Sequence, residues 1–371
     1  MPRETAAGSA RSVSLAANLG LAALGQAAWS ELGMEKAAAA GMAGALALLC
    51  FERQRLQSEL RAENERRTEL GLDLMKLRNK NMHSDKSVEV GHAMKPRRGD
   101  VFVSTYPKCG TTWMTQIVHM LRTRGDMGFG EITEVVPWDI LAWECGQDLD
   151  ADHVAEPRAF KSHEPWETIP KGEGARYIYV ARDPIDAFVS FFHFLPDYDG
   201  LIPGDITMEQ FKDAIFAGAA QAGQIWHHFL SWWNVRHRPD VLWITFEDLK
   251  DDLEGSIRKV AAFLEIECDA ELLAVVKEKS SFAFMSAPEN KHHFDDHFVR
   301  NACKPGMGLA EDSEVKVGKV RAGGGRAGRG RAAIPASVLS VLESKWAEVI
   351  TPATGCADYA ALRAKGNEFP E

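Results

Sequence analysis

The sequence predicts an α/β fold in which helices flank a central parallel sheet, with a helical extension at the N-terminus. A short apolar run followed by a helix pattern occurs three times between residues 101 and 264. This alternation is typical of a parallel sheet with helices on its faces. The chain has 371 residues, of which 45% are hydrophobic and 26% are charged. These are ordinary globular values, so the chain can bury a sizeable core, and wholesale disorder is excluded.

The expected elements follow one another from residue 101 to the C-terminus. The apolar runs predict strands at 101–105, 177–181 and 241–245. Helix patterns follow these strands and predict helices at 113–122, 184–194 and 253–264, with a last helix at 335–350. We assign residues 96–365 to this α/β domain.

The first 52 residues form an Ala-rich segment with two stretches that contain no charged residue, 12–30 and 37–51. The second stretch is shorter than the roughly 20 apolar residues that a membrane-spanning helix needs. Three interpretations stay open for this segment: a targeting peptide, a membrane hairpin, or soluble Ala-rich helices. The first two would send the protein to an organelle or allow membrane contact. The domain that follows is of a cytoplasmic type.

Residues 53–95 are interpreted as a charged helix and a linker. Leu56, Leu60, Leu70, Leu74 and Leu77 recur at helical spacing among many Arg and Glu residues. This pattern indicates a solvated amphipathic helix or a short coiled coil, and the solvated helix is the interpretation we favour. The polar stretch 81–100 then leads into the α/β domain.

Charge and cysteine content exclude two classes of protein. Lys and Arg number 43 against 53 Asp and Glu, which gives a net charge of −10. A nucleic-acid-binding protein usually has the opposite sign, so no nucleic-acid partner is expected. The six Cys residues include no C-x-x-C pair, so they do not form a disulfide framework.

The strongest functional signal is the segment Thr105-Tyr-Pro-Lys-Cys-Gly-Thr-Thr-Trp113, between the first strand and its helix. Backbone N–H groups and a helix N-terminus at such a turn attract an anion. Lys108 adds a positive charge and Gly110 allows close backbone approach. The segment lacks the G-x-x-x-x-G-K-[S/T] pattern of a Walker A loop. The alternative is an ordinary strand-to-helix turn.

Lys161 and His163 form a second signal because one residue separates them. In an extended segment their side chains share a face, where a cation could stabilise a leaving anion while the imidazole takes a proton. A lone histidine among twelve is more often structural.

A third signal lies at the end of the second predicted strand and in the helix after it. Arg182 ends the strand, where it could bind a phosphate at the sheet edge, and Ser190 lies two helical turns later. A salt bridge from Arg182 to Asp183 or Asp186 is the alternative. Further on, residues 321–331 form a basic Gly-rich loop, which is otherwise an ordinary surface loop.

Taken together, these motifs resemble one enzyme family. Residues 105–113 resemble the 5′-phosphosulfate loop of the sulfotransferases of the cytosolic type, whose usual form is TYPKSGTTW. Residues 179–194 resemble that family's 3′-phosphate motif, and residues 160–163 resemble its catalytic K-[T/S]-H segment. Residues 245–249 resemble its Y-E-D-[M/L] run, and residues 280–285 resemble its T-S-F-x-x-M. The motifs follow the family's order, and the likeness covers about 97–362.

The resemblance implies an enzyme with a P-loop-like sulfotransferase fold that uses 3′-phosphoadenosine 5′-phosphosulfate (PAPS) as co-substrate and needs no metal. It implies that His163 is the base, that Lys108 and Lys161 stabilise the charge of the leaving group, and that the acceptor is a small alcohol, phenol or amine. The residues implied in binding PAPS are Lys108, Cys109, Gly110, Thr111 and Thr112 at the 5′-phosphosulfate; Arg182, Ser190, Arg321 and Gly323 at the 3′-phosphate; and Trp113, Phe246, Ser281 and Phe282 at or beside the adenine.

The sequence departs from the family's pattern at three places. Cys109 stands where Ser is usual, and a thiol is the weaker hydrogen-bond donor. Phe246 replaces the more usual Tyr. The C-terminal loop has Ala322 and Arg326 where the family has a basic residue and a Gly, so its contacts to the donor are left open.

Two rival functions compete with this interpretation. A P-loop kinase-like phosphotransferase is disfavoured because G-K-[S/T] and a Mg²⁺-ligand pattern are absent. A membrane-tethered binding protein without catalysis would have no need for Lys161 and His163. Trp138 is either a wall of the acceptor pocket or a core residue. The acceptor itself and the oligomeric state are not readable from the sequence.

Overall fold

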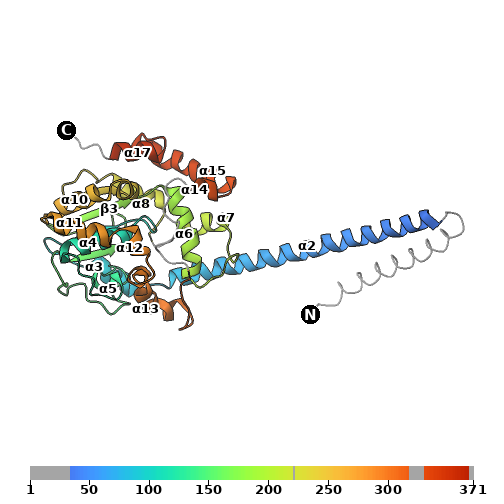
Figure 1. The fold of residues 1–371 in the computed structure, drawn as a ribbon, viewed down its shortest axis with the longest axis horizontal. Helices are drawn as coiled ribbons and strands as arrows, with labels where there is room; N and C mark the ends of the chain where they lie inside the picture. Colours follow the sequence, from blue (N-terminus) through green and yellow to red (C-terminus); the bar gives the residue numbers. More distant parts are fainter. Residues whose placement is uncertain (1–33, 220–221, 317–329, 367–371) are drawn as a thin grey trace. The chain divides into compact units, whose positions relative to one another are not determined.

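The first unit of the molecule is described through one long helix. The structure, a computed structural model, describes residues 34–219, 222–316 and 330–366. The chain divides into two compact units, 1–67 and 68–371. α2 (Met34–Lys80) supplies all that is described of the first unit and continues into the second (Figure 1). The helix predicted within 52–80 is confirmed, and it begins earlier because Ala has the highest helix propensity.

The uncharged stretch 37–51 is therefore part of α2. Within the described residues, none of the helices combines the length and the apolar character that crossing a membrane requires. The other uncharged stretch, 12–30, lies outside the described residues, so its three interpretations stay predictions.

The second unit is built on a parallel sheet, as predicted, but the sheet has four strands, and β2 was not among the three predicted ones. Its strands run in the order β2-β1-β3-β4. Their bounds are β1 (Val101–Ser104), β2 (Ala159–Ser162), β3 (Arg176–Ala181) and β4 (Val241–Thr245). β1 pairs with β2 so that Ser104 lies opposite Ser162. This register brings the residue after β1, Thr105, next to the residue after β2, His163.

Helices surround this sheet (Figure 1). Those before the last strand are α3 (Asp85–Ala93), α4 (Thr111–Thr123), α5 (Ile132–Val135), α6 (Pro184–Tyr198), α7 (Met208–Phe211), the π-helical segment η1 (Lys212–Ala219) and α8 (Ile225–Trp233). Those after it are α9 (Phe246–Asp251), α10 (Leu253–Leu264), α11 (Ala270–Lys279), α12 (Phe282–Ser286), the 3₁₀ turn η2 (Lys291–Phe294), α13 (His297–Met307), α14 (Gly330–Ala333), α15 (Ala336–Lys345), the π-helical segment η3 (Trp346–Ile350), α16 (Thr351–Thr354) and α17 (Tyr359–Gly366).

Alternate residues of the strands build the two sides of the core. Val103 and Ile178 belong to a cluster with apolar residues of α4, α10 and α11. Phe102 and Tyr179 belong to a second cluster with residues of α6, α8 and α15. This alternation is the pleat of a sheet that is buried on both faces, and it explains why each strand reads as an unbroken apolar run.

One expected linker contains a helix. α3 (Asp85–Ala93) lies within the polar stretch 81–100. A Cβ atom on Gly91 would lie 2.7 Å from the backbone oxygen of Asp139, so the helix backbone packs directly on residues beside the sheet. This helix was hard to predict because small residues, Ser87 and Gly91, make its buried face.

Candidate active site

The turn after β1 is shaped to receive an anion. Lys108 and Gly110 both adopt left-handed backbone conformations, with φ of 67° and 106°. Gly110 caps α4 without a side-chain hydrogen bond, so the first N–H groups of the helix keep no side-chain partner and can bind a negatively charged group. A Cβ atom at Gly110 would lie 2.9 Å from Cδ2 of Phe246. Glycine is thus required by the backbone conformation and by a neighbouring ring.

Arg182 joins the turn to the end of β3. Its Nη1 donates a hydrogen bond of 2.7 Å to the carbonyl oxygen of Lys108, and its guanidinium lies 4.3 Å from the ring centroid of Phe246. The side chain is 7% exposed, and its buried Nε has no hydrogen-bond partner among the described residues. A buried donor of this kind costs free energy unless an acceptor fills the site, which fits a phosphate ligand.

Aromatic side chains gather beside Arg182. The rings of Trp113 and Phe246 meet edge to face with centroids 5.5 Å apart, and Trp113 Nε1 donates to the carbonyl oxygen of Ser280 at 2.7 Å. Ser281 caps α12 by accepting from the N–H of Phe284, and Phe282 is 48% exposed. An exposed aromatic ring offers a face to a flat aromatic ligand.

Lys161 lies on β2 and is almost fully buried. Its side chain is 3% exposed. The ammonium lies 3.8 Å from the ring centroid of Trp138 and 3.4 Å from Oδ1 of Asp296. These contacts fix a charge that desolvation would otherwise make costly.

His163 follows β2 directly, and its ring is oriented by the turn. Nδ1 lies 2.7 Å from the carbonyl oxygen of Thr105, which can only accept, so Nδ1 carries the proton. Nε2 of the neutral imidazole is therefore the ring nitrogen that could accept a proton as a base. The ring meets Trp138 edge to face at 4.8 Å. Lys161 and His163 thus share one tryptophan, as expected of side chains on one face of an extended segment.

Further hydrogen bonds connect His163 to α4 and α8. The hydroxyls of Thr105 and Thr111 lie 2.5 Å apart, which links the His163 contact to the first residue of α4. His228 Nε2 donates to the carbonyl oxygen of His163 at 3.0 Å. Burial lowers the pKa of His228 to about 3, so its ring stays neutral and Tyr179 can donate to its Nδ1 at 3.2 Å.

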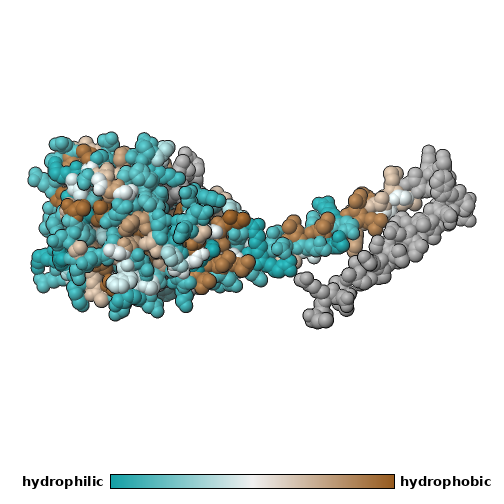
Figure 2. All heavy atoms as spheres, turned by 90° about the horizontal axis from the view of Figure 1, so that it is seen from below, coloured by the Kyte–Doolittle hydropathy of each residue, from teal (hydrophilic) through white to brown (hydrophobic). Residues whose placement is uncertain are grey.

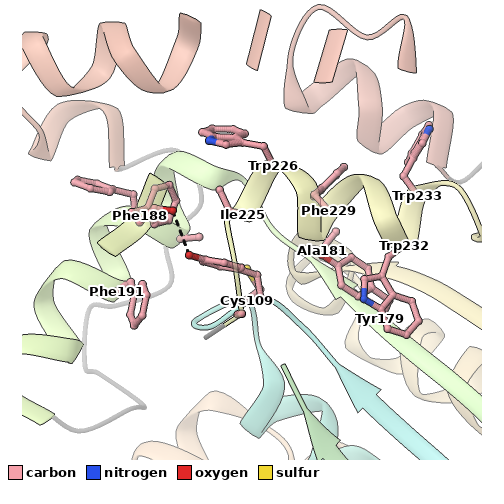
Figure 3. Packing of buried hydrophobic residues seen from close by; sticks show 14 of the residues in the cluster. Cys109, Tyr179, Ala181, Phe188, Phe191, Ile225, Trp226, Phe229, Trp232 and Trp233 are labelled. Atoms are coloured by element: carbon pink, nitrogen blue, oxygen red, sulfur yellow. Dashed lines mark hydrogen bonds between the residues drawn. The ribbon is translucent and has the colours of Figure 1, made fainter. Parts of the chain in front are cut away.

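The remaining predicted residues lie in different surroundings. Cys109 is buried in the core cluster (Figure 3), where burial raises the pKa of its thiol to about 12. Its N–H donates to the carbonyl oxygen of Tyr106. Thr112 and Ser190 are half-buried on α4 and α6, and the Lys108 ammonium lies 3.7 Å from the ring centroid of Phe194.

Arg321 and Gly323 lie outside the described residues, as do Ala322 and Arg326. The described chain resumes at Gly330, whose N–H donates to Oδ1 of Asp186 at 2.9 Å. The end of the Gly-rich loop is thereby held against α6, the helix that carries Ser190.

Several residues near the site had no signal in the sequence. Asp296 is distant in sequence from Lys161, and His228 is one histidine in a Trp-rich helix. Near β2, the buried carboxyl groups of Asp139 and Glu164 each keep one oxygen without a hydrogen-bond partner among the described residues. The other oxygen of Glu164 lies 2.9 Å from Nε2 of His92, on α3. Among the residues that the structure describes, no group of three or more His, Cys, Asp or Glu side chains could hold a metal ion.

A sulfotransferase domain model matches residues 98–302 of this chain. The chain belongs to the sulfotransferase domain family. The match contains every site residue predicted from the sequence except Arg321 and Gly323, and it favours the sulfotransferase interpretation of the turn over the P-loop kinase alternative.

Curated relatives agree with the family model. Sulfotransferase 2B1 of Mus musculus is 32% identical over 213 residues, which are 56% of this chain and 62% of the relative. The amine sulfotransferase of Oryctolagus cuniculus is 32% identical over 199 residues, or 51% of this chain and 64% of the relative. The chain thus spans less than two thirds of the length of either relative.

Solved structures share the fold. A mouse sulfotransferase complexed with PAP has a TM-score of 0.51 and 22% identity, and the match covers 72% of this chain and 90% of that chain. Retinol dehydratase in a complex with retinol and PAP has the same TM-score and identity, with 71% and 85% covered.

Proposed function

We propose that the chain is an enzyme that transfers the sulfuryl group of PAPS to a hydroxyl or amine of a small-molecule acceptor. The observation that carries the proposal is the contact of His163 with Thr105. One residue of the anion-binding turn orients a base, and the buried ammonium of Lys161 lies on the same tryptophan. A base and a cation beside an anion site are the groups that sulfuryl transfer needs.

The donor is assigned to the turn and to Arg182. The free N–H groups at the start of α4 and the Lys108 side chain would bind the 5′-phosphosulfate. Arg182 would bind the 3′-phosphate through its unpartnered Nε. Trp113, Phe246 and Phe282 would contact the adenine. The structure of a family member complexed with PAP, the nucleotide that remains after PAPS loses its sulfuryl group, supports this class of donor.

The acceptor attacks the sulfur in line with the departing phosphate oxygen. His163 Nε2 removes the acceptor's proton as the new bond to sulfur forms and the bond from sulfur to the bridging oxygen breaks. Negative charge then builds on the released nucleotide, where Lys108, Lys161 and the N–H groups of α4 stabilise it. His163 must be neutral to act as this base.

Cys109 takes no direct part in this scheme. Its thiol is buried, and its N–H is bonded within the turn, so we assign it to the packing of the turn. The acceptor class rests on the relatives, among which are an amine sulfotransferase and a protein solved with retinol. Trp138 would form part of the acceptor site because it contacts both Lys161 and His163.

The proposal is tested by transfer of radioactive sulfate from labelled PAPS to a panel of alcohols, phenols and amines. We expect labelled product with at least one acceptor class, and no phosphate transfer when labelled ATP replaces PAPS. Phosphate transfer from ATP, or absence of PAP binding by calorimetry, would contradict it.

A further inference from the structure

A regular row of side chains runs along the part of α2 that lies in the first unit. Met42, Leu46, Leu49, Leu56 and Leu60 are each at least 55% exposed. Their spacing alternates between three and four residues once Arg53 is counted in the series, and Glu63 and Arg67 continue it. A repeat of 3.5 residues keeps such a row on one face of a helix and is the pattern of a coiled-coil seam.

This seam needs a partner. Figure 2 shows apolar residues gathered along the described helix. Leucine side chains lose little conformational entropy when they are ordered, and burying their apolar surface away from water lowers the free energy. A single exposed helix leaves these leucine side chains in water, so their burial contributes no stability to it. The seam also contains Arg53, Glu63 and Arg67, and these charges restrict which partner fits.

We propose that residues 49–67 of α2 pair with the same residues of a second copy of the chain, in an antiparallel coiled coil. A parallel pair in register would place Arg53 opposite Arg53 and Glu63 opposite Glu63, with like charges in the seam. The antiparallel pair instead places Arg53 opposite Glu63 of the second copy, twice. It also places Leu56 opposite Leu60 of the second copy at its centre.

Residues beside the seam support the same arrangement. Glu52 comes near Arg66 of the second copy, again twice, which adds two attractive pairs. Within one helix, Glu52 already lies 3.1 Å from Arg55, and Glu63 contacts Arg66. The centre brings the two copies of Glu59 near each other. Arg55, 3.8 Å from Glu59 in the same helix, offsets that repulsion.

The experiment measures the mass of the full chain in solution by sedimentation equilibrium. We expect a dimer, and we expect the double change Leu56→Glu and Leu60→Glu to give a monomer. Leu48→Glu is the matched control, because Leu48 is exposed on the same helix but lies outside the seam. A monomeric wild-type chain would overturn the proposal. A dimer that survives the double change would also overturn it.

The direction of pairing is tested by charge reversal. Arg53→Glu places like charges at both ends of the antiparallel pair and should weaken dimerisation roughly tenfold or more. Combining it with Glu63→Arg should restore the wild-type dissociation constant. A parallel pair would respond differently, because Arg53→Glu merely exchanges one like-charge pair for another. Unchanged dimerisation in Arg53→Glu would therefore contradict the antiparallel arrangement.

Disulfide trapping gives an independent readout. Cys50 is a free, exposed thiol, and the antiparallel pair brings it beside position 64 of the second copy. Oxidised Asn64→Cys should form covalent dimers linked between positions 50 and 64, identified by mass spectrometry. Ala62→Cys, on the outer face, should not. Equal cross-linking in both variants would sink the assignment.

Discussion

The anion-binding turn and the strand β2 lie side by side, yet they are held in place by different means. The turn takes its shape from the backbone, through two left-handed residues and a carbonyl oxygen that accepts from Arg182. Lys161 and His163 are instead held by side chains from distant elements, namely Trp138, Asp296 and His228. The turn therefore depends on its own backbone and on one side chain from the end of β3, whereas Lys161 and His163 depend on side chains from three separate segments.

Removing the base should have the largest effect and should leave the turn intact. We expect His163→Ala to lower kcat by about 10²–10⁴-fold, since that is what a positioned general base contributes. PAP binding, measured by calorimetry, should stay near the wild-type value because the turn does not need the imidazole. His227→Ala serves as the control, because His227 is an exposed histidine of α8 next to His228 in the sequence. Near-normal turnover in His163→Ala would remove the base assignment.

The buried cation should come next. We expect Lys161→Met to lower kcat by about 10²-fold, because the charge on the leaving nucleotide loses a desolvated partner. The matched control is Lys171→Met, because Lys171 also lies over a tryptophan ring, that of Trp166, outside the assigned site. A single-turnover assay separates the chemical step from product release. An equal loss in both variants would show that only packing was disturbed.

The shape of the turn is tested at Gly110. We expect Gly110→Ala to destabilise the protein by about 1–3 kcal/mol through its positive φ and to weaken PAP binding through the contact with Phe246. Gly99→Ala is the control, since Gly99 has a φ of 90° but open space around the added Cβ. Gly99→Ala should lower the free energy of unfolding but leave PAP binding unchanged. Urea unfolding and calorimetry read the two effects, and equal PAP affinity in both variants would contradict the role of the ring.

The smallest effect concerns the carboxyl groups beneath β2. Burial, then the nearby charge of Glu164, raises the pKa of Asp139 from 3.8 to about 7. Between these two values the native state keeps a proton that the unfolded chain has lost, so stability falls as pH rises. Asp139→Asn removes this penalty.

We therefore expect Asp139→Asn to be more stable than the wild type at pH 8 and to show no such gain at pH 4. Urea unfolding at both pH values measures the difference, with the exposed Asp150→Asn as control. The same change in stability at both pH values would show that Asp139 does not titrate as described.

Local features of the turn could be predicted from the sequence, whereas contacts between distant segments could not. The turn was predictable because a strand, a glycine and a helix follow one another directly. The pairing of β1 with β2 then brings His163 next to Thr105, the first residue of the turn. Asp296, His228 and α3 were not predictable because their contacts depend on tertiary packing between segments far apart in the chain. Cys109 was predicted at the donor, but its side chain packs into the core. Its neighbours in sequence gave no sign of that direction.

We propose that the Lys108 turn and Arg182 bind opposite ends of one nucleotide. Calorimetry with PAP and with AMP, which lacks the 3′-phosphate, measures whether they do. We expect the wild type to prefer PAP, Arg182→Ala to lose about 10- to 100-fold of that preference, and Lys108→Ala to weaken both nucleotides alike. If Arg182→Ala keeps the full preference for PAP over AMP, the two groups do not hold the same ligand.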